Sequence, residues 1–577
     1  MNSIATSTSF TTSTDRFWLK HYPAGVPHDV DYKQYSSLAQ LIEEAFAKYR
    51  NRKAYVCMDQ VLTFGQVDDM SKSLAAWLQS KGLEKGDRVA LMMPNVLQYP
   101  VAIAAVLRAG FVVVNVNPLY TPRELEHQLK DSGSKAIIIL ENFATTLEHV
   151  IAKTSIKHVV VASMGDLFGI VKGTLVNFAV RHVKKMVPAF TLPNATAFNS
   201  ALGEGTSLPF KVPSLTVEDV AFLQYTGGTT GVSKGATLVH RNVIANVLQS
   251  EAWMQPAVKK KGASLEDQTT SVCALPLYHI FALTICCLLG MRTGGFNILI
   301  PNPRDMAATV KALRGHTINM FPAVNTLYNG LAQNEEFRKL DFSGLMVSNG
   351  GGMAVQEAVA KQWLELTGCA ICEGYGLSET SPSATCNPTD TDAYSGTIGL
   401  PLPSTEIAIL DDDGKPVPLG ERGEIAIRGP QVMAGYWQRQ DETDKVMTPD
   451  GFFKSGDVGI MDERGFTKIV DRKKNMILVS GFNVYPNEIE GVVASHPGVL
   501  ECAAIGVPDK NSGEAVKIFV VKKKDSLTER EVQEFCAEQL TGYKKPKYIE
   551  FRADLPKTNV GKILHRELRD AELKKRA

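Results

Sequence analysis

The sequence lacks an excess of charge of either sign. Lys and Arg total 62 and Asp and Glu total 61, so the formal net charge of the 577 residues is +1. Proteins that bind a nucleic-acid backbone carry a clear surplus of basic residues. We therefore predict no nucleic-acid partner and interpret the lysine runs at 259–261 and 522–524 as solvated charges.

Cysteine is also scarce, and its positions favour neither a disulfide framework nor a zinc site. The chain has nine cysteines, and the adjacent pair Cys286 and Cys287 lies inside an apolar run. Cys369 and Cys372 form a CxxC pattern, but no second Cys or His pair stands at zinc spacing. We expect a reducing compartment.

Long apolar stretches are missing as well. The longest apolar-leaning run, 280–291, is shorter than the about 20 residues that cross a bilayer. The first residues, MNSIATSTSFTTST, contain neither the apolar core nor the early basic cluster of a secretory signal. These absences predict a cytoplasmic protein without a transmembrane helix.

The chain does contain a repeated alternation of helical and strand patterns, over 73–142 and again over 271–372. After Ser404 short strands with turn signals replace it, and a compact mixed unit follows. We predict an α/β fold. Its large N-terminal body, residues 1–473, has layered α/β subdomains and a β-rich portion, and a small mobile C-terminal α+β domain, residues 474–577, follows a hinge.

The stretch YTGGTTGVSKG, residues 225–235, has the composition of a phosphate-binding loop. Glycines let several backbone N–H groups converge on an anion, and hydroxyls and a lysine add donors. It is not a Walker loop, because Lys234 precedes Gly235 instead of Ser or Thr. We predict that it binds a polyphosphate through Thr226, Gly227, Gly228, Thr229, Thr230, Gly231, Ser233 and Lys234.

Four further motifs carry polar groups that suit a nucleotide site. The segment EGYGLSET, residues 373–380, fits neither a dinucleotide fingerprint nor a nucleophile elbow, but supplies an aromatic ring, a hydroxyl and a carboxylate. An Asp in KSGD, residues 454–457, and an Arg in DRKK, residues 471–474, suit the hydroxyls of a ribose. The fourth motif, PKTNVGKILHR, places Lys562 after a glycine near the C-terminus.

Together, in this order and spacing, the motifs closely resemble those of the adenylate-forming superfamily of acyl-CoA synthetases, luciferases and peptide-synthetase adenylation domains. The resemblance extends from about Trp18 to Leu568, and 450–474 is similar to the fatty acyl-CoA synthetase signature. NVNPLYTPRELEHQLKDSG and LPLYHIFALT are similar to bacterial long-chain fatty acid:CoA ligases.

The resemblance implies a two-step reaction, in which a fatty carboxylate attacks the α-phosphorus of ATP and the thiol of coenzyme A then displaces AMP. Both nucleophiles belong to substrates, which agrees with the lack of an evident catalytic triad. Two alternatives remain open: a CoA ligase for medium-chain or aromatic acids, and a non-catalytic lipid- or nucleotide-binding relative.

The resemblance also implies roles for individual residues. The catalytic candidates are Lys562, Lys474 as the hinge, and Glu379. The ATP-binding candidates are the loop of residues 226–234, Gly351, Gly352, Tyr375, Gly376, Ser378, Asp457 and Arg472. Mg²⁺ would be held by Thr226 and Glu379, the coenzyme A step would use the loop Ser480, Gly481 and Phe482, and His279 would lie beside the acyl pocket, although a plain core histidine fits equally well.

The sequence departs from the family pattern at Asn475, where an Asp is usual, and at Ser378, which replaces the commoner Thr. Residues 167–187 mix apolar side chains with Lys172, Arg181, Lys184 and Lys185. This segment suits either a bilayer surface, on the inner face of the membrane, or an insertion packed on the protein. Preferred acyl chain length is left open, as is the oligomeric state, a homodimer included.

Overall fold

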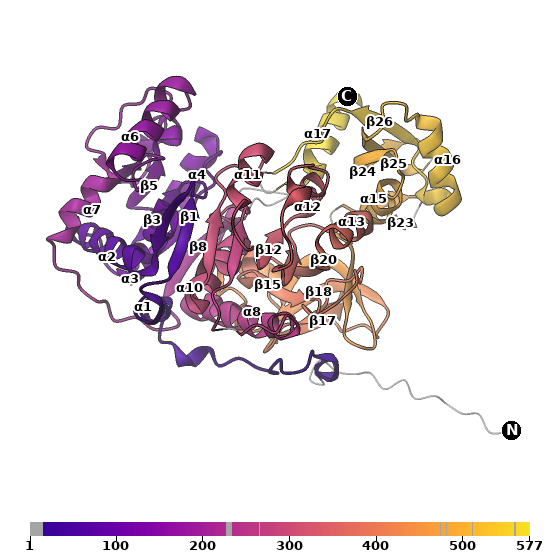
Figure 1. Ribbon diagram of the computed structural model, residues 1–577. Helices are drawn as coiled ribbons and strands as arrows, with labels where there is room; N and C mark the ends of the chain where they lie inside the picture. Colours follow the sequence, from indigo (N-terminus) through magenta and orange to yellow (C-terminus); the bar gives the residue numbers. More distant parts are fainter. Residues whose placement is uncertain are drawn as a thin grey trace.

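The computed structural model describes residues 16–226, 233–264, 266–472, 475–480, 482–510, 512–558 and 561–576; the side chains of Arg472, Asn483 and Arg576 are not described. Figure 1 shows a large body of several layers with a smaller C-terminal domain above one end of it. The predicted fold class is confirmed. The boundary at 473/474 falls on residues outside this description and stays a prediction.

The first large sheet has nine strands, parallel in the middle and antiparallel at both ends. Its order is β16 (Leu400–Pro401), β15 (Ser383–Cys386), β14 (Ile371–Gly376), β13 (Val347–Gly350), β12 (Met320–Ala323), β10 (Thr270–Cys273), β11 (Phe296–Leu299), β1 (Lys53–Cys57) and β2 (Gln60–Thr63).

The second large sheet has eight strands. Six of them, from β8 to β7 in the order below, pair with one another in parallel. Its order is β19 (Gly435–Tyr436), β9 (Lys234–Val239), β8 (Val220–Thr226), β4 (Val112–Asn115), β3 (Arg88–Met92), β5 (Ala136–Leu140), β6 (His158–Ala162) and β7 (Thr196–Ala197). The β8–β9 hairpin carries the glycine-rich motif at its turn.

Helices cover these sheets on both faces, as parallel strands require. The helices of the body are α1 (Leu38–Tyr49), α2 (Phe64–Ser80), α3 (Gln98–Arg108), α4 (Pro122–Ser132), α5 (Ala144–Glu148), α6 (Ile170–Phe178), α7 (Phe198–Thr206), α8 (His240–Lys260), α9 (Ile280–Ala282), α10 (Leu289–Thr293), α11 (Met306–Leu313), α12 (Asn325–Ala332), α13 (Glu357–Thr367) and α14 (Gln440–Val446). No helix in the described ranges combines the length and the apolar character needed to span a membrane.

Local sequence signals account for the helix boundaries. In α4, Thr121 accepts the backbone N–H of Glu124 while the Glu124 side chain accepts the N–H of Thr121, and Pro122 begins the helix. Gly133 ends it in the left-handed conformation, with φ of 60°. The alternating segments predicted between 73 and 142 are confirmed as α2, β3, α3, β4, α4 and β5.

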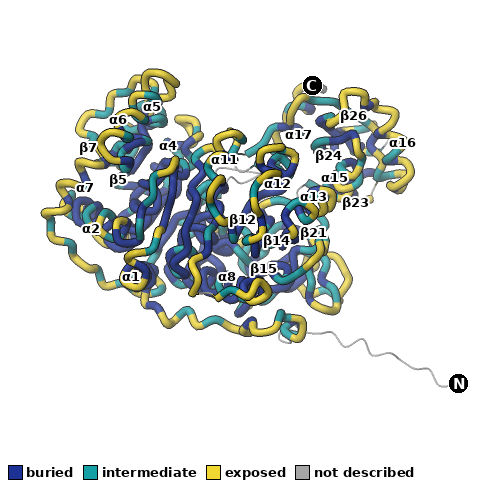
Figure 2. The backbone as a smooth tube through the Cα atoms, viewed as in Figure 1, coloured by how far each residue is buried: buried dark blue, intermediate teal, exposed yellow. Residues whose placement is uncertain are grey.

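One apolar core joins the two large sheets. It contains Val89 and Leu91 of β3 together with Tyr55 of β1 and Val272 of β10. Ala90 and the other alternate residues of β3 face a second cluster, under α4. Figure 2 shows the strands of both sheets as buried segments at the centre of the molecule. The two large sheets therefore form one rigid platform under the loops at their edges.

A four-stranded antiparallel sheet forms the predicted β-rich portion, with the order β17 (Glu406–Leu410), β18 (Arg422–Arg428), β20 (Phe453–Met461) and β21 (Thr467–Arg472). The C-terminal domain has strands β23 (Phe482–Val484), β22 (Ile477–Val479), β25 (Gly513–Lys522), β24 (Val499–Asp509) and β26 (Tyr548–Arg552), with α15 (Pro486–Ala494), α16 (Glu529–Gln539) and α17 (His565–Arg576). It has apolar clusters of its own, as a domain does.

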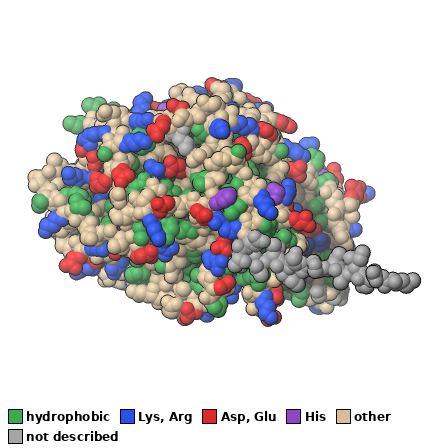
Figure 3. Space-filling model, turned by 90° about the horizontal axis from the view of Figure 1, so that it is seen from below, with side chains coloured by type: hydrophobic (Ala, Val, Ile, Leu, Met, Phe, Trp, Pro, Cys, Tyr) green, Lys and Arg blue, Asp and Glu red, His purple; other side chains and the backbone are tan. Residues whose placement is uncertain are grey.

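The surface carries both signs of charge. Figure 3 shows acidic and basic side chains interspersed over the face seen there, without a large area of one sign. This distribution agrees with the near-zero net charge of the sequence.

Candidate active site

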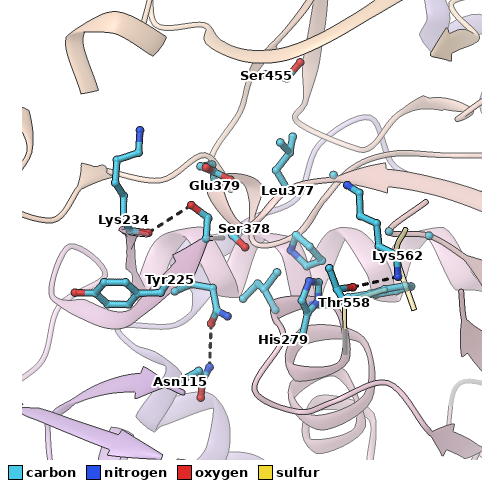
Figure 4. A pocket seen from close by; sticks show the side chains of 18 of the residues that line it. Asn115, Tyr225, Lys234, His279, Leu377, Ser378, Glu379, Ser455, Thr558 and Lys562 are labelled. Atoms are coloured by element: carbon cyan, nitrogen blue, oxygen red, sulfur yellow. Dashed lines mark hydrogen bonds between the residues drawn. The ribbon is translucent and has the colours of Figure 1, made fainter. Parts of the chain in front are cut away.

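The motifs converge on one large cavity of about 1270 Å³ (Figure 4). It lies where the carboxyl ends of β13 and β14 face the β8–β9 hairpin, the four-stranded sheet and the C-terminal domain, a usual position for ligands of parallel sheets. The predicted site residues that line it are Thr226, Lys234, His279, Gly351, Gly352, Tyr375, Gly376, Ser378, Glu379 and Lys562.

The motif after β14 is held by a close backbone approach. A Cβ atom on Gly376 would lie 1.8 Å from the carbonyl oxygen of Pro382, so only glycine fits there. The N–H of Leu377 donates to that same oxygen, over 3.1 Å. The following turn presents Ser378 and Glu379 to the cavity, as Figure 4 shows.

The carboxylate of Glu379 is buried and oriented. Its Oε1 accepts a hydrogen bond from the hydroxyl of Tyr436, over 2.8 Å, and burial together with this carboxylate raises the pKa of Tyr436. The phenol is therefore protonated and donates. Thr226, at the end of β8, lines the same cavity.

Mg²⁺ needs few protein ligands when it binds together with phosphates. It prefers oxygen ligands and usually keeps waters, with one or two carboxylates from the protein. The described residues hold no group of three or more His, Cys, Asp and Glu arranged for a metal. The Glu379 carboxylate and the Thr226 hydroxyl supply oxygen ligands of the kind that Mg²⁺ prefers.

Three basic side chains line the cavity on the side of the glycine-rich motif: Lys234, Arg439 and Lys445. Lys234 Nζ lies 2.7 Å from an oxygen of Glu442 and 4.4 Å from the centre of the Tyr436 ring. Ser233 does not line the cavity, and its hydroxyl donates to the carbonyl of Thr226, over 2.7 Å, which ties the two ends of the loop together. The predicted residues Gly227, Gly228, Thr229, Thr230 and Gly231 lie outside the described residues.

The aromatic and ribose motifs are joined directly. The hydroxyl of Tyr375 donates to Oδ2 of Asp457, over 2.6 Å, and both side chains are buried. Asp457 and Arg472 are direct partners in the antiparallel pairing of β20 and β21. The structure thus pairs the backbones of the two ribose candidates next to the cavity-lining Gly456, although Asp457 itself is absent from the cavity lining.

Lys562 reaches the cavity from a tight turn of the C-terminal domain. Gly561 has φ of 82°, and a Cβ atom there would lie 2.5 Å from the hydroxyl oxygen of Thr326, at the start of α12. The turn therefore needs glycine and sits against the body. The N–H of Lys562 donates to the hydroxyl of Thr558, over 3.1 Å. Lys474 lies outside the described residues.

His279 lies close to Lys562 in this cavity (Figure 4). Its Nδ1 accepts the N–H of Phe281, over 3.3 Å, at the start of α9. Burial, with a further contribution from the charge of Lys562, lowers the pKa of His279 to about 4, so the ring is neutral at pH 7. Phe281 lines the cavity, while most of the apolar residues that follow it are core.

The loop predicted for the second half-reaction lies elsewhere. Ser480 and Phe482 are absent from the cavity lining, and Gly481 is outside the described residues. The Phe482 ring stacks on Tyr543, with 4.6 Å between ring centres, and the N–H of Ser480 donates to the carbonyl of Ser512. Both contacts stay inside the C-terminal domain.

Several cavity residues were not predicted from the sequence. The segment GYWQRQDET, residues 435–443, supplies Tyr436, Arg439 and Glu442. Asn115, at the end of β4, and Gln224, near the end of β8, are paired through their amides, over 3.0 Å. A polar residue at the carboxyl end of an otherwise apolar parallel strand was the available signal for these two.

A layered α/β body, with an oriented carboxylate and a lysine of the C-terminal domain in one cavity at its strand ends, suits an enzyme that binds a nucleotide. The family model of the AMP-binding enzymes matches residues 42–437, and that of the AMP-binding enzyme C-terminal domain matches residues 488–562. The chain belongs to the AMP-binding enzymes.

The chain is similar over nearly its full length to named ligases and to a solved structure. A long-chain-fatty-acid–CoA ligase of Escherichia coli O6:H1 is 56% identical over 556 residues, which cover 96% of this chain and 98% of that protein. A long-chain-fatty-acid–CoA ligase of Yersinia pestis is 56% identical over 97% of this chain and 99% of its own length. The ATP-bound MatB of Rhodopseudomonas palustris superposes with a TM-score of 0.77 at 28% identity, covering 92% of this chain and 98% of that one.

Proposed function

We propose that this chain is a long-chain fatty acid:CoA ligase, which activates the acid with ATP as an acyl-adenylate and transfers the acyl group to coenzyme A. The observation that carries this proposal is the convergence of Lys562 and Glu379 on one cavity, in a chain 56% identical to ligases of that description over nearly its full length. AMP and pyrophosphate are the other products.

The first step brings two anions together. A carboxylate that approaches a triphosphate is repelled, strongly so in a partly dry site, unless cations offset the charge. In this proposal Lys562, which lines the cavity, contacts both the carboxylate and the α-phosphate as the new C–O–P linkage forms and pyrophosphate leaves. Mg²⁺, held by Glu379 and Thr226, supplies charge neutralisation on the phosphates when bound.

We carry the nucleotide roles over from the resemblance to the adenylate-forming family. The loop of residues 226–234 binds the β- and γ-phosphates, and the hydroxyl of Ser378 donates to the α-phosphate. Tyr375 stacks on adenine beside Gly351 and Gly352, and Gly376 keeps the following turn close to the sheet. Asp457 accepts the ribose hydroxyls with support from Arg472. The Tyr375 hydroxyl, which donates to Asp457, supports the proposed positions of both groups.

The two half-reactions need different surroundings. With Lys562 in the cavity and Ser480 and Phe482 outside it, the observed arrangement suits adenylate formation. In our proposal the domain after residue 473 turns about Lys474, withdraws Lys562 and brings the loop of residues 480–482 to the adenylate. Separate apolar clusters in the C-terminal domain support movement as a unit.

The acyl chain is placed by the apolar lining of the cavity. Leu275, Ile280, Phe281 and Val324 contribute to it near His279. The neutral His279 ring adds no charge that would have to be desolvated with the chain. We assign the start of the acyl site to this region, without a chain-length limit.

Peripheral membrane contact is a second element of the proposal, and it is supported by exposed apolar side chains. Ile170 and Val171 of α6 are 90% and 75% exposed, and Leu175 and Phe178 on the same helix are also exposed. Clustered exposed apolar side chains of this kind are typical of interaction surfaces. A membrane surface would give the enzyme direct access to its lipid substrate.

Only part of the basic charge predicted for this segment is available to lipid headgroups. Arg181 pairs with Glu141, over 2.8 Å, and Lys172 donates to the carbonyl of Met58. Lys184 and Lys185 are exposed between the exposed apolar residues Val183 and Met186. These two lysines are therefore the electrostatic part of the proposed contact.

Product analysis tests the proposed function. Purified protein with Mg²⁺, ATP, coenzyme A and oleate should form oleoyl-CoA, AMP and pyrophosphate in equal amounts. A panel of long-chain, medium-chain and aromatic acids distinguishes this activity from the alternative CoA ligases. Absence of AMP with every acid would instead favour a non-catalytic binding protein.

Sedimentation with liposomes tests the membrane contact. Anionic vesicles should pellet the enzyme in a salt-sensitive way, and the double variant Lys184→Glu and Lys185→Glu should lose most of this binding. The matched control is Lys523→Glu with Lys524→Glu, two exposed lysines in the C-terminal domain. Equal binding of both double variants, or no binding of the wild type, would contradict the contact.

A further inference from the structure

A single carboxylate, that of Glu442, forms ion pairs with three basic side chains of the cavity. Glu442, on α14, lies 2.7 Å from Nζ of Lys234 through one oxygen. Its other oxygen lies 2.6 Å from Nζ of Lys445 and 3.4 Å from a guanidinium nitrogen of Arg439. All four side chains line the cavity, on the side of the glycine-rich motif.

These cations are what a terminal phosphate needs. Lys234 belongs to the phosphate-loop motif, and Lys445 and Arg439 add two more positive charges within reach of the same point. Arg439 is also paired with Asp441, over 2.9 Å, but Asp441 does not line the cavity. Glu442 is thus the carboxylate that lies between Lys234 and Lys445.

The Glu442 side chain is well suited to move away from the lysines when an anionic ligand binds. Its exposed fraction is 22%, and it projects from a helix of seven residues instead of a strand of the rigid sheets. Nearby Lys234 and Lys445 lower the pKa of Glu442 to about 2, so it is ionised at every pH at which the enzyme would work. An always-ionised carboxylate competes with an anionic ligand over the whole working range.

We propose that Glu442 is an internal competitor of pyrophosphate: it yields Lys234 and Lys445 to the β- and γ-phosphates of ATP and takes them back as pyrophosphate leaves. The inference rests on the proposed function and adds to it a residue that governs product release. Glu442 is a positioning residue, because it acts through the lysines and not on the reacting atoms.

If Glu442 had a purely structural role, removing its charge would change the affinity for pyrophosphate in the opposite direction. If the carboxylate only anchors Lys234, its removal disorders the lysine and weakens the binding of every polyphosphate. If it competes, its removal leaves the lysines unopposed and strengthens that binding. The sign of the change in pyrophosphate affinity therefore separates the two roles.

The experiment measures pyrophosphate as a competitive inhibitor against ATP in thioester formation. Glu442→Gln keeps the shape of the side chain and removes its charge, and we expect the inhibition constant of pyrophosphate to fall about tenfold, since one screened charge pair is lost. Glu442→Asp keeps the charge but shortens the reach, so an intermediate constant is expected. The matched control is Glu357→Gln, on exposed α13, where Glu357 pairs with Lys361 away from the cavity.

Stopped-flow measurement of pyrophosphate release gives a second readout, and release should be slower in Glu442→Gln than in the wild type. An unchanged or weaker pyrophosphate affinity in Glu442→Gln, with the melting temperature of the wild type, overturns the inference while leaving the proposed function in place. A wild-type enzyme that forms no acyl-CoA would overturn the proposed function itself.

Discussion

The hydroxyl of Tyr375 donates to the carboxylate of Asp457 across two sheets, over 2.6 Å. Tyr375 is the next-to-last residue of β14 in the nine-stranded sheet, and Asp457 lies on β20 of the four-stranded sheet. Both are buried, so this bond is strong and fixes the orientation of the carboxylate. The proposed base-binding and ribose-binding residues are therefore positioned by each other.

Tyr375→Phe should raise the KM for ATP by about tenfold, because a buried charge-assisted hydrogen bond contributes on the order of 1–3 kcal/mol. The aromatic face is kept, so stacking on adenine should persist. The matched control is Tyr22→Phe, whose hydroxyl donates to the carbonyl of Pro401 over the same 2.6 Å but lies outside the cavity lining. Steady-state kinetics with varied ATP would contradict the assignment if both variants raised KM equally.

Lys562→Ala should reduce adenylate formation by at least about a hundredfold, as expected for loss of an electrostatic group in the transition state. Conversion of supplied oleoyl-AMP and coenzyme A to thioester should stay near the wild-type rate. Lys544→Ala, which removes a lysine paired with Glu488 in the same domain, is the control. Comparable damage to both half-reactions would show that the role of Lys562 is wrong.

Glu379→Gln should raise the Mg²⁺ concentration for half-maximal AMP formation by about tenfold, because an amide oxygen is a poorer ligand than a carboxylate. Tyr436→Phe keeps the carboxylate and removes its hydrogen-bond donor, so it should shift the Mg²⁺ requirement much less. Mg²⁺ titrations of the two variants show whether the carboxylate itself is needed. Equal shifts would mean that Glu379 acts only through its contact with Tyr436.

Glu373 supports a prediction about pH and stability. Burial raises the pKa of this carboxyl from 4.5 to about 8, and its Oε1 accepts the N–H of Val355 over 3.2 Å. The folded state therefore favours the protonated form. The contribution to the free energy of unfolding is complete below pH 4.5 and declines as the pH rises through about 8.

Glu373→Gln imitates the protonated form at every pH. Its melting temperature relative to the wild type should therefore rise steadily from pH 5 to pH 8, as thermal scans in one series of buffers would show. Glu357→Gln, on the exposed surface of α13, should run parallel to the wild type. A constant difference between Glu373→Gln and the wild type would contradict the raised pKa.

The order of elements in the body could be predicted because each carries its own signal. The apolar run of β5 has all five residues buried, and Thr121, Pro122 and Gly133 set the ends of α4. Glycines were informative for the same reason: Gly376 and Gly561 occupy positions that no other residue can take. These are local constraints, and the sequence displays local constraints directly.

The contribution of residues 435–446 could not be predicted. Tyr436 and Glu442 enter the cavity because β19 pairs with β9, a contact between segments about two hundred residues apart. No composition or spacing marks such pairing. The exposure of Ile170 could not be predicted either. An apolar helix has the same sequence pattern whether its apolar side chains are covered or exposed.

The burial of every cysteine has a practical consequence. All nine lie within the described ranges, and burial raises the pKa of Cys57, for example, to about 12, which leaves almost no thiolate. A maleimide dye should consequently ignore the native thiols. Two surface cysteines added by mutagenesis, one on each side of the hinge, would carry the only fluorophores, and distance changes between them would record whether the C-terminal domain swings during turnover.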